Sequence, residues 1–182
     1  MSDAPSDATS DAPSDAPSDT MSEPKAHPAM RRSTARLLAV QALYQIERSG
    51  SDPESVIQEF LEHRQEQEID GARLVAADAP RFRSLVKGVC SEQEDLDNML
   101  LAVLDVDWTL ERLEPLLLVI MRAGIYEISS HNDVPPRVVI NEYVNVARAF
   151  YGGKEPGLVN GILDRLAKDL RTEEMTSPQK KS

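Results

Sequence analysis

Three arginines and a tyrosine are the residues of this 182-residue chain best suited to binding a ligand. Arg32 and Arg36 are four residues apart, so they share one face if a helix begins before them. Cations are unfavourable at a helix N-terminus, whereas a phosphate backbone favours them. Tyr44, two turns further on, offers a surface on which an unpaired base can stack. With Arg31 they predict RNA binding; the alternative is that Arg31 and Arg32 are only solvated and Tyr44 is a core residue.

A second motif, Asp105-Val106-Asp107-Trp108-Thr109, resembles the nucleophile motif of the haloacid dehalogenase-like phosphatases. In that family the first aspartate is phosphorylated and the second acts as an acid or base. This chemistry requires a strand that ends at the motif, a parallel sheet, a lysine and further magnesium ligands. Residues 99–104 instead end a helical stripe. We therefore expect the end of one helix here, followed by a helix capped by Asp107 or Thr109.

Other reactive residue types are sparse. His27, His63 and His131 have no metal ligand or nucleophile at a short spacing, so we expect solvated side chains. The single cysteine, Cys90, excludes a disulfide within the chain and is expected to be a small core residue. Gly152-Gly153-Lys154 lacks the spacing and the preceding strand of a phosphate-binding loop. We expect no catalytic residue, metal site or cofactor.

The apolar residues recur at helical spacing in most of the chain, and no segment alternates with a period of two. The pattern predicts about seven helices in an all-α, compact bundle. The first helix is expected to be capped by Ser33 or Thr34 and to end at Gly50. The third is expected to be long, from Pro80 to about Leu104.

Composition divides the chain into three parts. Residues 1–28 are an acidic tail whose Ser/Asp/Ala/Pro repeat, residues 2–20, has no apolar residue larger than alanine, which predicts disorder. Residues 29–171 are expected to form one helical RNA-binding domain, and residues 172–182 a flexible tail. The formal net charge is −11, but residues 1–24 carry six acidic residues and no lysine or arginine. An acidic total therefore does not exclude RNA, and the tail could compete with RNA for the arginines.

Four segments occur in the order and at the separations typical of one known family. They are residues 36–44, residues 121–127, residues 133–142 with Val-Ile-Asn-Glu at their end, and Val-Asn-Gly-Ile-Leu-Asp at 159–164. On these segments the chain resembles the NusB family of transcription antitermination proteins, over roughly residues 31–170. The resemblance implies a fold of two packed three-helix subdomains.

The resemblance also implies a function. It implies a transcription antitermination factor that binds the boxA RNA of ribosomal RNA leaders together with the ribosomal protein NusE. It further implies assembly with RNA polymerase in an antitermination complex, and a cytoplasmic protein that is a monomer or homodimer when free. No apolar run is long enough to span a membrane. The alternative is an RNA-binding helical module that assists ribosomal RNA modification or processing. Neither function includes catalysis.

By position, the family's RNA contacts fall on residues of the first and sixth helices. They are Arg31, Arg32, Arg36, Tyr44, Arg148, Phe150 and Lys154. Two departures weaken the expected contacts: Ser33 and Thr34 replace further arginines, and residues 155–158 replace a common His-Lys-Phe segment. We expect Asn141, Glu142 and Asn160 to hold the helices in register through hydrogen bonds rather than to bind RNA.

Overall fold

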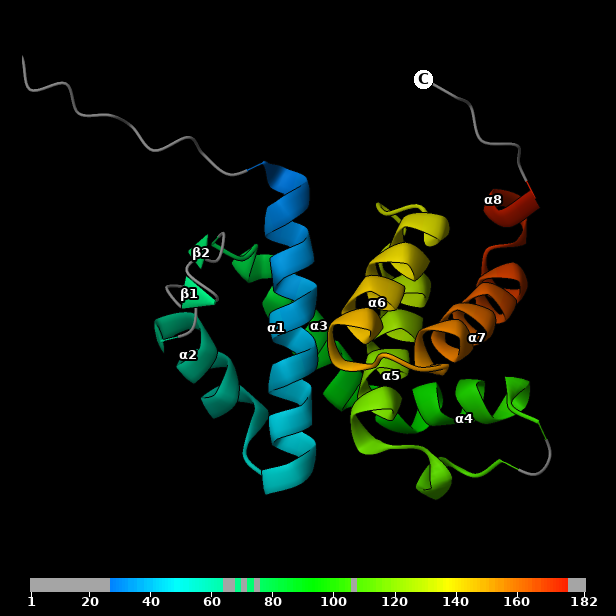
Figure 1. Cartoon of the computed structure of the whole chain (residues 1–182), viewed down its shortest axis with the longest axis horizontal. Coiled ribbons are helices and arrows are strands. Elements are labelled where there is room, and N and C mark those ends of the chain that lie inside the picture. Colours follow the sequence, from blue (N-terminus) through cyan, green and yellow to red (C-terminus); the bar gives the residue numbers. More distant parts are fainter. Residues whose placement is uncertain (1–26, 64–67, 70–71, 74–75, 106–107, 177–182) are drawn as a thin grey trace, which may run out of the picture.

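The computed structural model describes residues 27–63, 68–69, 72–73, 76–105 and 108–176 (Figure 1). The helices are α1 (Pro28–Ser49), α2 (Pro53–His63), α3 (Ala79–Ser91), α4 (Gln93–Val103), the 3-10 helix η1 (Leu110–Arg112), α5 (Pro115–Ser130), α6 (Pro136–Phe150), α7 (Glu155–Leu170) and α8 (Thr172–Thr176). The strands β1 (Glu68–Ile69) and β2 (Ala72–Arg73) pair antiparallel. The predicted all-α fold is confirmed, since these two-residue strands are only a short ladder beside the helices.

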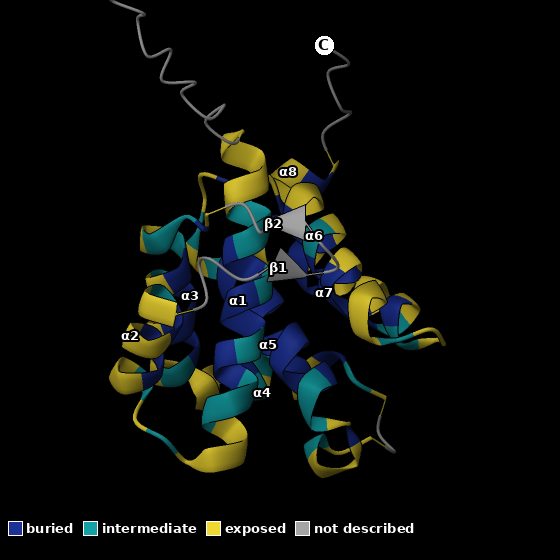
Figure 2. Ribbon diagram, turned by 60° about the vertical axis from the view of Figure 1, so that its left-hand side comes forward, coloured by how far each residue is buried: buried dark blue, intermediate teal, exposed yellow. Residues whose placement is uncertain are grey.

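The helix α5 is the centre of the molecule. Its residues from Leu117 to Ile128 are all buried, and it packs against α1, α3, α4, α6 and α7. The helices α1, α2 and α3 form a group on one side of it, α6 and α7 lie on the other, and α4 crosses beneath α5 and α7 (Figure 1). The burial colouring shows the darkest region where α1, α3 and α5 meet (Figure 2). Among the described residues, no helix is both long and apolar enough to cross a bilayer.

The helix α1 begins earlier than predicted. It starts at Pro28, and the ring of His27 accepts the cap hydrogen bond from the backbone N–H of Ala29. The hydroxyls of Ser33 and Thr34, predicted as caps, donate instead to carbonyls one turn back inside the helix. The cap prediction was wrong because proline is well suited to the first helical position.

The predicted long third helix is two helices. α3 and α4 are separated at Glu92, which has φ −108° and ψ 16°. The apolar stripe of α3 packs on α1, α2 and α5, whereas that of α4 packs on α5 and α7. A straight helix would not reach both sets of partners. The helical spacing of apolar residues continues across Glu92 although the chain changes direction there, and this is why the sequence predicted one helix.

The C-terminal end of the described chain is also more ordered than the sequence suggested. The predicted flexible tail from residue 172 begins with α8, in which Met175 is buried. Arg171 is buried and donates to the carbonyl of Val134 at 2.8 Å and to Glu174 at 2.6 Å. These contacts hold α8 against the start of α6. Residues 1–26 and 177–182, the rest of the two predicted tails, lie outside the described residues.

Candidate nucleic-acid interface

Arg36, one of the predicted RNA contacts, lies in the interior. Only 3% of it is exposed, and its guanidinium donates to both oxygens of Glu127, at 2.9 and 2.6 Å. A third N–H group donates to Glu142 at 3.2 Å. Burial alone would lower the pKa of Arg36, but the hydrogen bonds and charge of Glu127 outweigh it and raise the pKa. The guanidinium is therefore a fixed charge between α1, α5 and α6.

Glu127 accepts hydrogen bonds from two further residues. It is fully buried, and it accepts from the Tyr143 hydroxyl at 3.0 Å and from Arg81 at 3.4 Å. Burial, together with the charge of Glu127, raises the pKa of Tyr143 well above its ordinary value, so its hydroxyl stays protonated and donates. We call Arg36, Arg81, Glu127, Glu142 and Tyr143 the Arg36 cluster. It joins α1, α3, α5 and α6 at one point.

A second buried arginine has a similar role. Arg122 on α5 donates to both carboxylate oxygens of Asp97 at 2.7 and 2.8 Å, and to Glu47 at 3.2 Å. These contacts join α5 to α4 and to the end of α1. The signal for both clusters was present in the sequence, because Arg122 and Glu127 are charged residues inside the apolar run of α5.

The other two arginines of α1 differ from Arg36 and from each other. Arg31 is exposed, but its guanidinium donates to the carbonyls of Ala76 and Ala77 at 3.3 and 3.4 Å, which ties the start of α1 to the segment before α3. Arg32 is half-buried and has no hydrogen bond or ion pair with the described residues. Of the three predicted arginines, Arg32 is the one that is partly accessible and whose guanidinium N–H groups form no hydrogen bond with the described residues.

A groove lies beside Arg32, between α1 and α6. Its volume is about 260 Å³, and we call it the α1–α6 groove. It is lined by Ser33, Thr34, Leu37, Glu142, Asn145, Val146 and Ala149. Arg32 immediately precedes the residues of one wall, and Arg148, exposed on α6, donates to Asn145 of the other wall at 3.2 Å. Neither arginine lines the groove itself, but each is next to a residue that does, Arg32 in sequence and Arg148 through its hydrogen bond.

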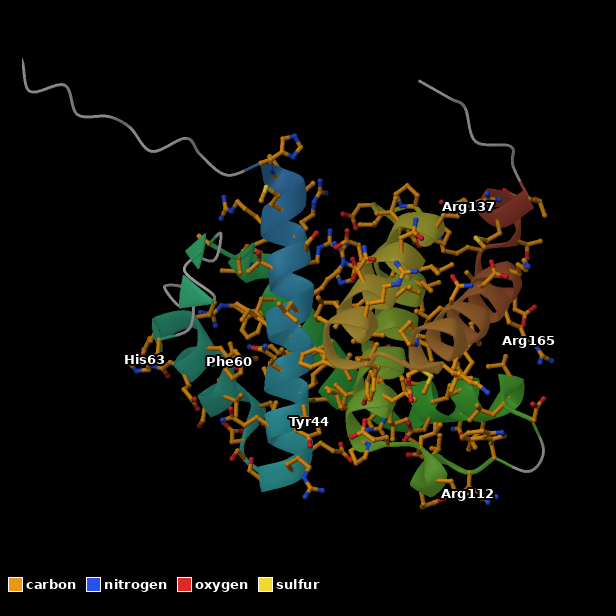
Figure 3. All side chains as sticks on the ribbon, viewed as in Figure 1. Tyr44, Phe60, His63, Arg112, Arg137 and Arg165 are labelled. Atoms are coloured by element: carbon orange, nitrogen blue, oxygen red, sulfur yellow. The ribbon has the colours of Figure 1, made fainter. Side chains whose placement is uncertain are left out.

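The remaining predicted residues lie at the ends of the same two helices. Tyr44 is half-buried on the lower part of α1 (Figure 3). Phe150, at the end of α6, is 40% exposed, and Lys154 is exposed in the turn that follows. Lys154 also lines a second pocket of about 440 Å³, with Trp108, Arg112, Leu113, Glu114, Leu117, Tyr151, Glu155 and Leu158. This pocket joins the α6–α7 turn to η1.

Trp108 is the residue that the sequence reasoning missed. It was considered only as part of the phosphatase-like motif, yet it is 43% exposed and lines the second pocket together with Leu158. The sequence could have indicated Trp108, because it is the single tryptophan of the chain and lies beside a predicted helix boundary. Asp105 of that motif is exposed and follows the helix α4 rather than a strand, and residues 106–107 lie outside the described residues. In the described part of the chain, no group of three or more His, Cys, Asp or Glu side chains is arranged to hold a metal ion.

The polar residues of the two family motifs divide into two kinds. Glu142 is bound by Arg36 and so holds helices together, as predicted. Asn141 and Asn160 are exposed and form no side-chain hydrogen bond with the described residues, so the same prediction is wrong for them. Both asparagines instead line a pocket between α6 and α7.

Known proteins resemble this chain over most of its length. The NusB family model matches residues 33–168. The transcription antitermination protein NusB of Rhizobium leguminosarum bv. trifolii is 47% identical over 145 residues, which are 80% of this chain and 91% of that protein. The protein of the same name from Caulobacter vibrioides is 47% identical over 140 residues, or 77% of this chain and 94% of that protein.

The solved structures agree with this. The structure of T. maritima NusB superposes with a TM-score of 0.66 at 26% identity and covers 80% of this chain and 97% of that one. The region that the family model matches contains α1 from Ser33 onward, the Arg36 cluster and both walls of the α1–α6 groove. The chain therefore belongs to the NusB family.

Proposed function

We propose that this protein is a transcription antitermination factor without catalytic activity of its own. It binds the boxA RNA of ribosomal RNA leaders together with the ribosomal protein NusE, as part of an antitermination complex on RNA polymerase. The similar proteins named transcription antitermination protein NusB support the general role. When free of RNA and NusE, the protein is a monomer or homodimer.

The α1–α6 groove is the observation that carries the RNA-binding part of this proposal. Arg32 precedes Ser33 of one wall and is half-buried, and Arg148 is exposed and donates to Asn145 of the other wall. Guanidinium groups on two sides of a depression can bind successive phosphates of a single strand. The floor contains the apolar side chains of Leu37 and Val146, which suit the face of a base.

The aromatic residues extend the same surface. Phe150 at the end of α6 is exposed and Tyr44 on the lower part of α1 is half-buried, and we propose that bases stack on both rings. Leu158 stands where the family commonly has phenylalanine, and Trp108 lines the same pocket. We propose that Trp108 supplies the aromatic surface that Leu158 lacks, with Lys154 as the neighbouring cation.

Arg36 has a different part in this proposal. Its guanidinium is enclosed by Glu127 and Glu142, so it positions α1 against α6 from beneath the groove and does not contact phosphate. Arg31 contributes mainly through its two bonds to the backbone before α3. A double variant of Arg32 and Arg36 would therefore confuse loss of RNA contacts with loss of the fold.

Binding of boxA RNA and of a scrambled RNA, each with and without NusE, tests the proposal. We expect tight binding only for boxA with NusE present. Arg32→Ala and Arg148→Ala should each weaken binding and reduce the slope of log affinity against log salt by about 0.7 per lost phosphate contact on a single strand. Arg48→Ala is the matched control, because Arg48 is exposed at the opposite end of α1. Equal binding of boxA and scrambled RNA under all conditions would contradict the function.

A further inference from the structure

The two motif asparagines face a pocket that the proposed RNA groove does not include. The pocket has a volume of about 360 Å³ and lies between α6 and α7, beside α8. It is lined by Arg137, Ile140, Asn141, Asn160, Asp164, Lys168 and Met175. Asn141 comes from Val-Ile-Asn-Glu and Asn160 from Val-Asn-Gly, two segments that are nearly twenty residues apart in sequence. We call this the asparagine pocket.

The asparagine side chains are not used by the fold. Both are exposed, and neither forms a side-chain hydrogen bond with the described residues. Other residues of the pocket do have partners: the Arg137 guanidinium donates to the Met175 carbonyl at 2.6 Å, and Lys168 pairs with Asp164 at 2.6 Å. Two amides with free donors and acceptors toward the described chain therefore line one polar depression.

The charges of the pocket favour an anionic ligand. Its lining contains two cations, Arg137 and Lys168, and one anion, Asp164. Asp164 lies next to Lys168, so the excess positive charge falls toward Arg137, which is exposed near the start of α6 and beside α8 (Figure 3). A guanidinium binds phosphate through two parallel hydrogen bonds, so a phosphate is one anion that suits this pocket.

The helix α6 connects this pocket to the α1–α6 groove. Arg137, Asn141, Asn145 and Arg148 are all exposed and are spaced three or four residues apart, so they form one stripe along the helix. The first two line or border the asparagine pocket, and the last two border the groove. At about 1.5 Å per residue the stripe is roughly 16 Å long, which is enough for more than one nucleotide.

We propose that the asparagine pocket is a second nucleotide subsite, which binds one unpaired ribonucleotide of the same RNA strand. This inference rests on the proposed function and extends it along α6. Asn141 and Asn160 read the edge of the base, and Arg137 binds its phosphate. A carboxamide presents a donor and an acceptor in one plane, which matches the N6/N7 edge of adenine, so adenosine is the preferred occupant.

Two measurements on the full chain test the subsite. The first is the affinity of Asn141→Ala/Asn160→Ala, measured with NusE present, for a boxA-containing single strand of about twelve nucleotides. We expect roughly a tenfold loss, as for a lost bidentate base contact. Asn98→Ala, a change of an exposed asparagine on α4, is the matched control and should bind as the unchanged protein does. The second is NMR of the side-chain amides during titration with AMP, CMP and inorganic phosphate. The signals of Asn141 and Asn160 should shift with AMP more than with CMP, and not with phosphate alone.

The outcomes separate this inference from the proposed function. If Arg32→Ala weakens RNA binding but the asparagine variant does not and AMP shifts neither amide, the subsite is refuted and the function stands. If the protein binds no RNA but AMP still shifts both amides, the pocket is a mononucleotide site and the proposed function fails. If the asparagine variant and Asn98→Ala lose affinity equally, the loss is not specific and the subsite is refuted.

Discussion

Arg32 and Arg36 lie one turn apart on α1, yet the molecule uses them in different ways. Arg36 is enclosed by Glu127 and Glu142, whereas Arg32 borders the α1–α6 groove and has no partner among the described residues. Residues four apart share a helix face only approximately, and the boundary between core and surface runs between these two. The same residue type therefore supports the fold at one position and offers a free cation at the next.

The partners explain the difference. Glu127 and Glu142 are 91 and 106 residues beyond Arg36 in the chain, and both come from helices that pack against α1. No such carboxylate faces Arg32 in the described structure. A buried charge is tolerated only where charged or hydrogen-bonding partners surround it, so the Arg36 cluster requires all of its members.

The largest effect is expected at the centre of the Arg36 cluster. Glu127→Ala leaves Arg36 buried without its main partner and removes the acceptor of Tyr143. The free energy of unfolding, measured with guanidinium chloride, should fall by about 3–5 kcal/mol. Glu54→Ala removes the exposed pair with Lys87 and should cost about 0–1 kcal/mol. Similar losses for the two variants would show that the cluster is no more important than a surface pair.

A smaller loss of stability is expected from a substitution at Gly88, where α3 approaches α5 closely. A Cβ atom added at Gly88 would overlap the ring of Tyr126, so Gly88→Ala must displace either that ring or α3, which carries Arg81. Overpacking of this kind should cost about 1–3 kcal/mol in the free energy of unfolding. Gly161→Ala on α7 is the control, since an added Cβ meets nothing within 4 Å there, and it should stabilise the helix by about 0.5–1 kcal/mol. The account is contradicted if the two substitutions have the same sign.

The smallest effect on the free energy of unfolding is expected from protonation of His131, which lies near Arg81 and Glu127 of the Arg36 cluster. Burial lowers the pKa of His131 and the charge of Arg81 lowers it further, against opposing effects of Glu127 and Asp133. The unfolded chain therefore binds a proton more readily than the folded one, and the folded state loses stability as the pH falls through about 6.5. The loss of stability between about pH 7.5 and pH 5.5 should be smaller in His131→Gln than in the unchanged protein. An equal loss in both would show that another group causes it.

Much of the fold was predictable because apolar spacing and proline positions mark most helices. The break at Glu92 was not, since the apolar stripe continues across it, and the start of α1 was misplaced because Ser33 and Thr34 imitate a cap. For the site, spacing predicted Arg32 and the family resemblance predicted Arg148, but neither showed the burial of Arg36, which depends on carboxylates from distant helices. The pocket shared by Asn141 and Asn160 depends on the packing of α6 on α7, which one sequence does not show.

The central claim is that Arg32 contacts RNA and Arg36 holds the fold. The most direct test measures both RNA affinity and the free energy of unfolding for Arg32→Gln and Arg36→Gln. We expect Arg32→Gln to lower the affinity for boxA RNA in the presence of NusE, and to leave the unfolding free energy within about 0.5 kcal/mol of the unchanged protein. Arg36→Gln should lower the unfolding free energy by about 3–5 kcal/mol, while its folded fraction binds RNA with nearly unchanged affinity. If Arg36→Gln folds with unchanged stability and loses RNA binding, while Arg32→Gln binds normally, the account is contradicted.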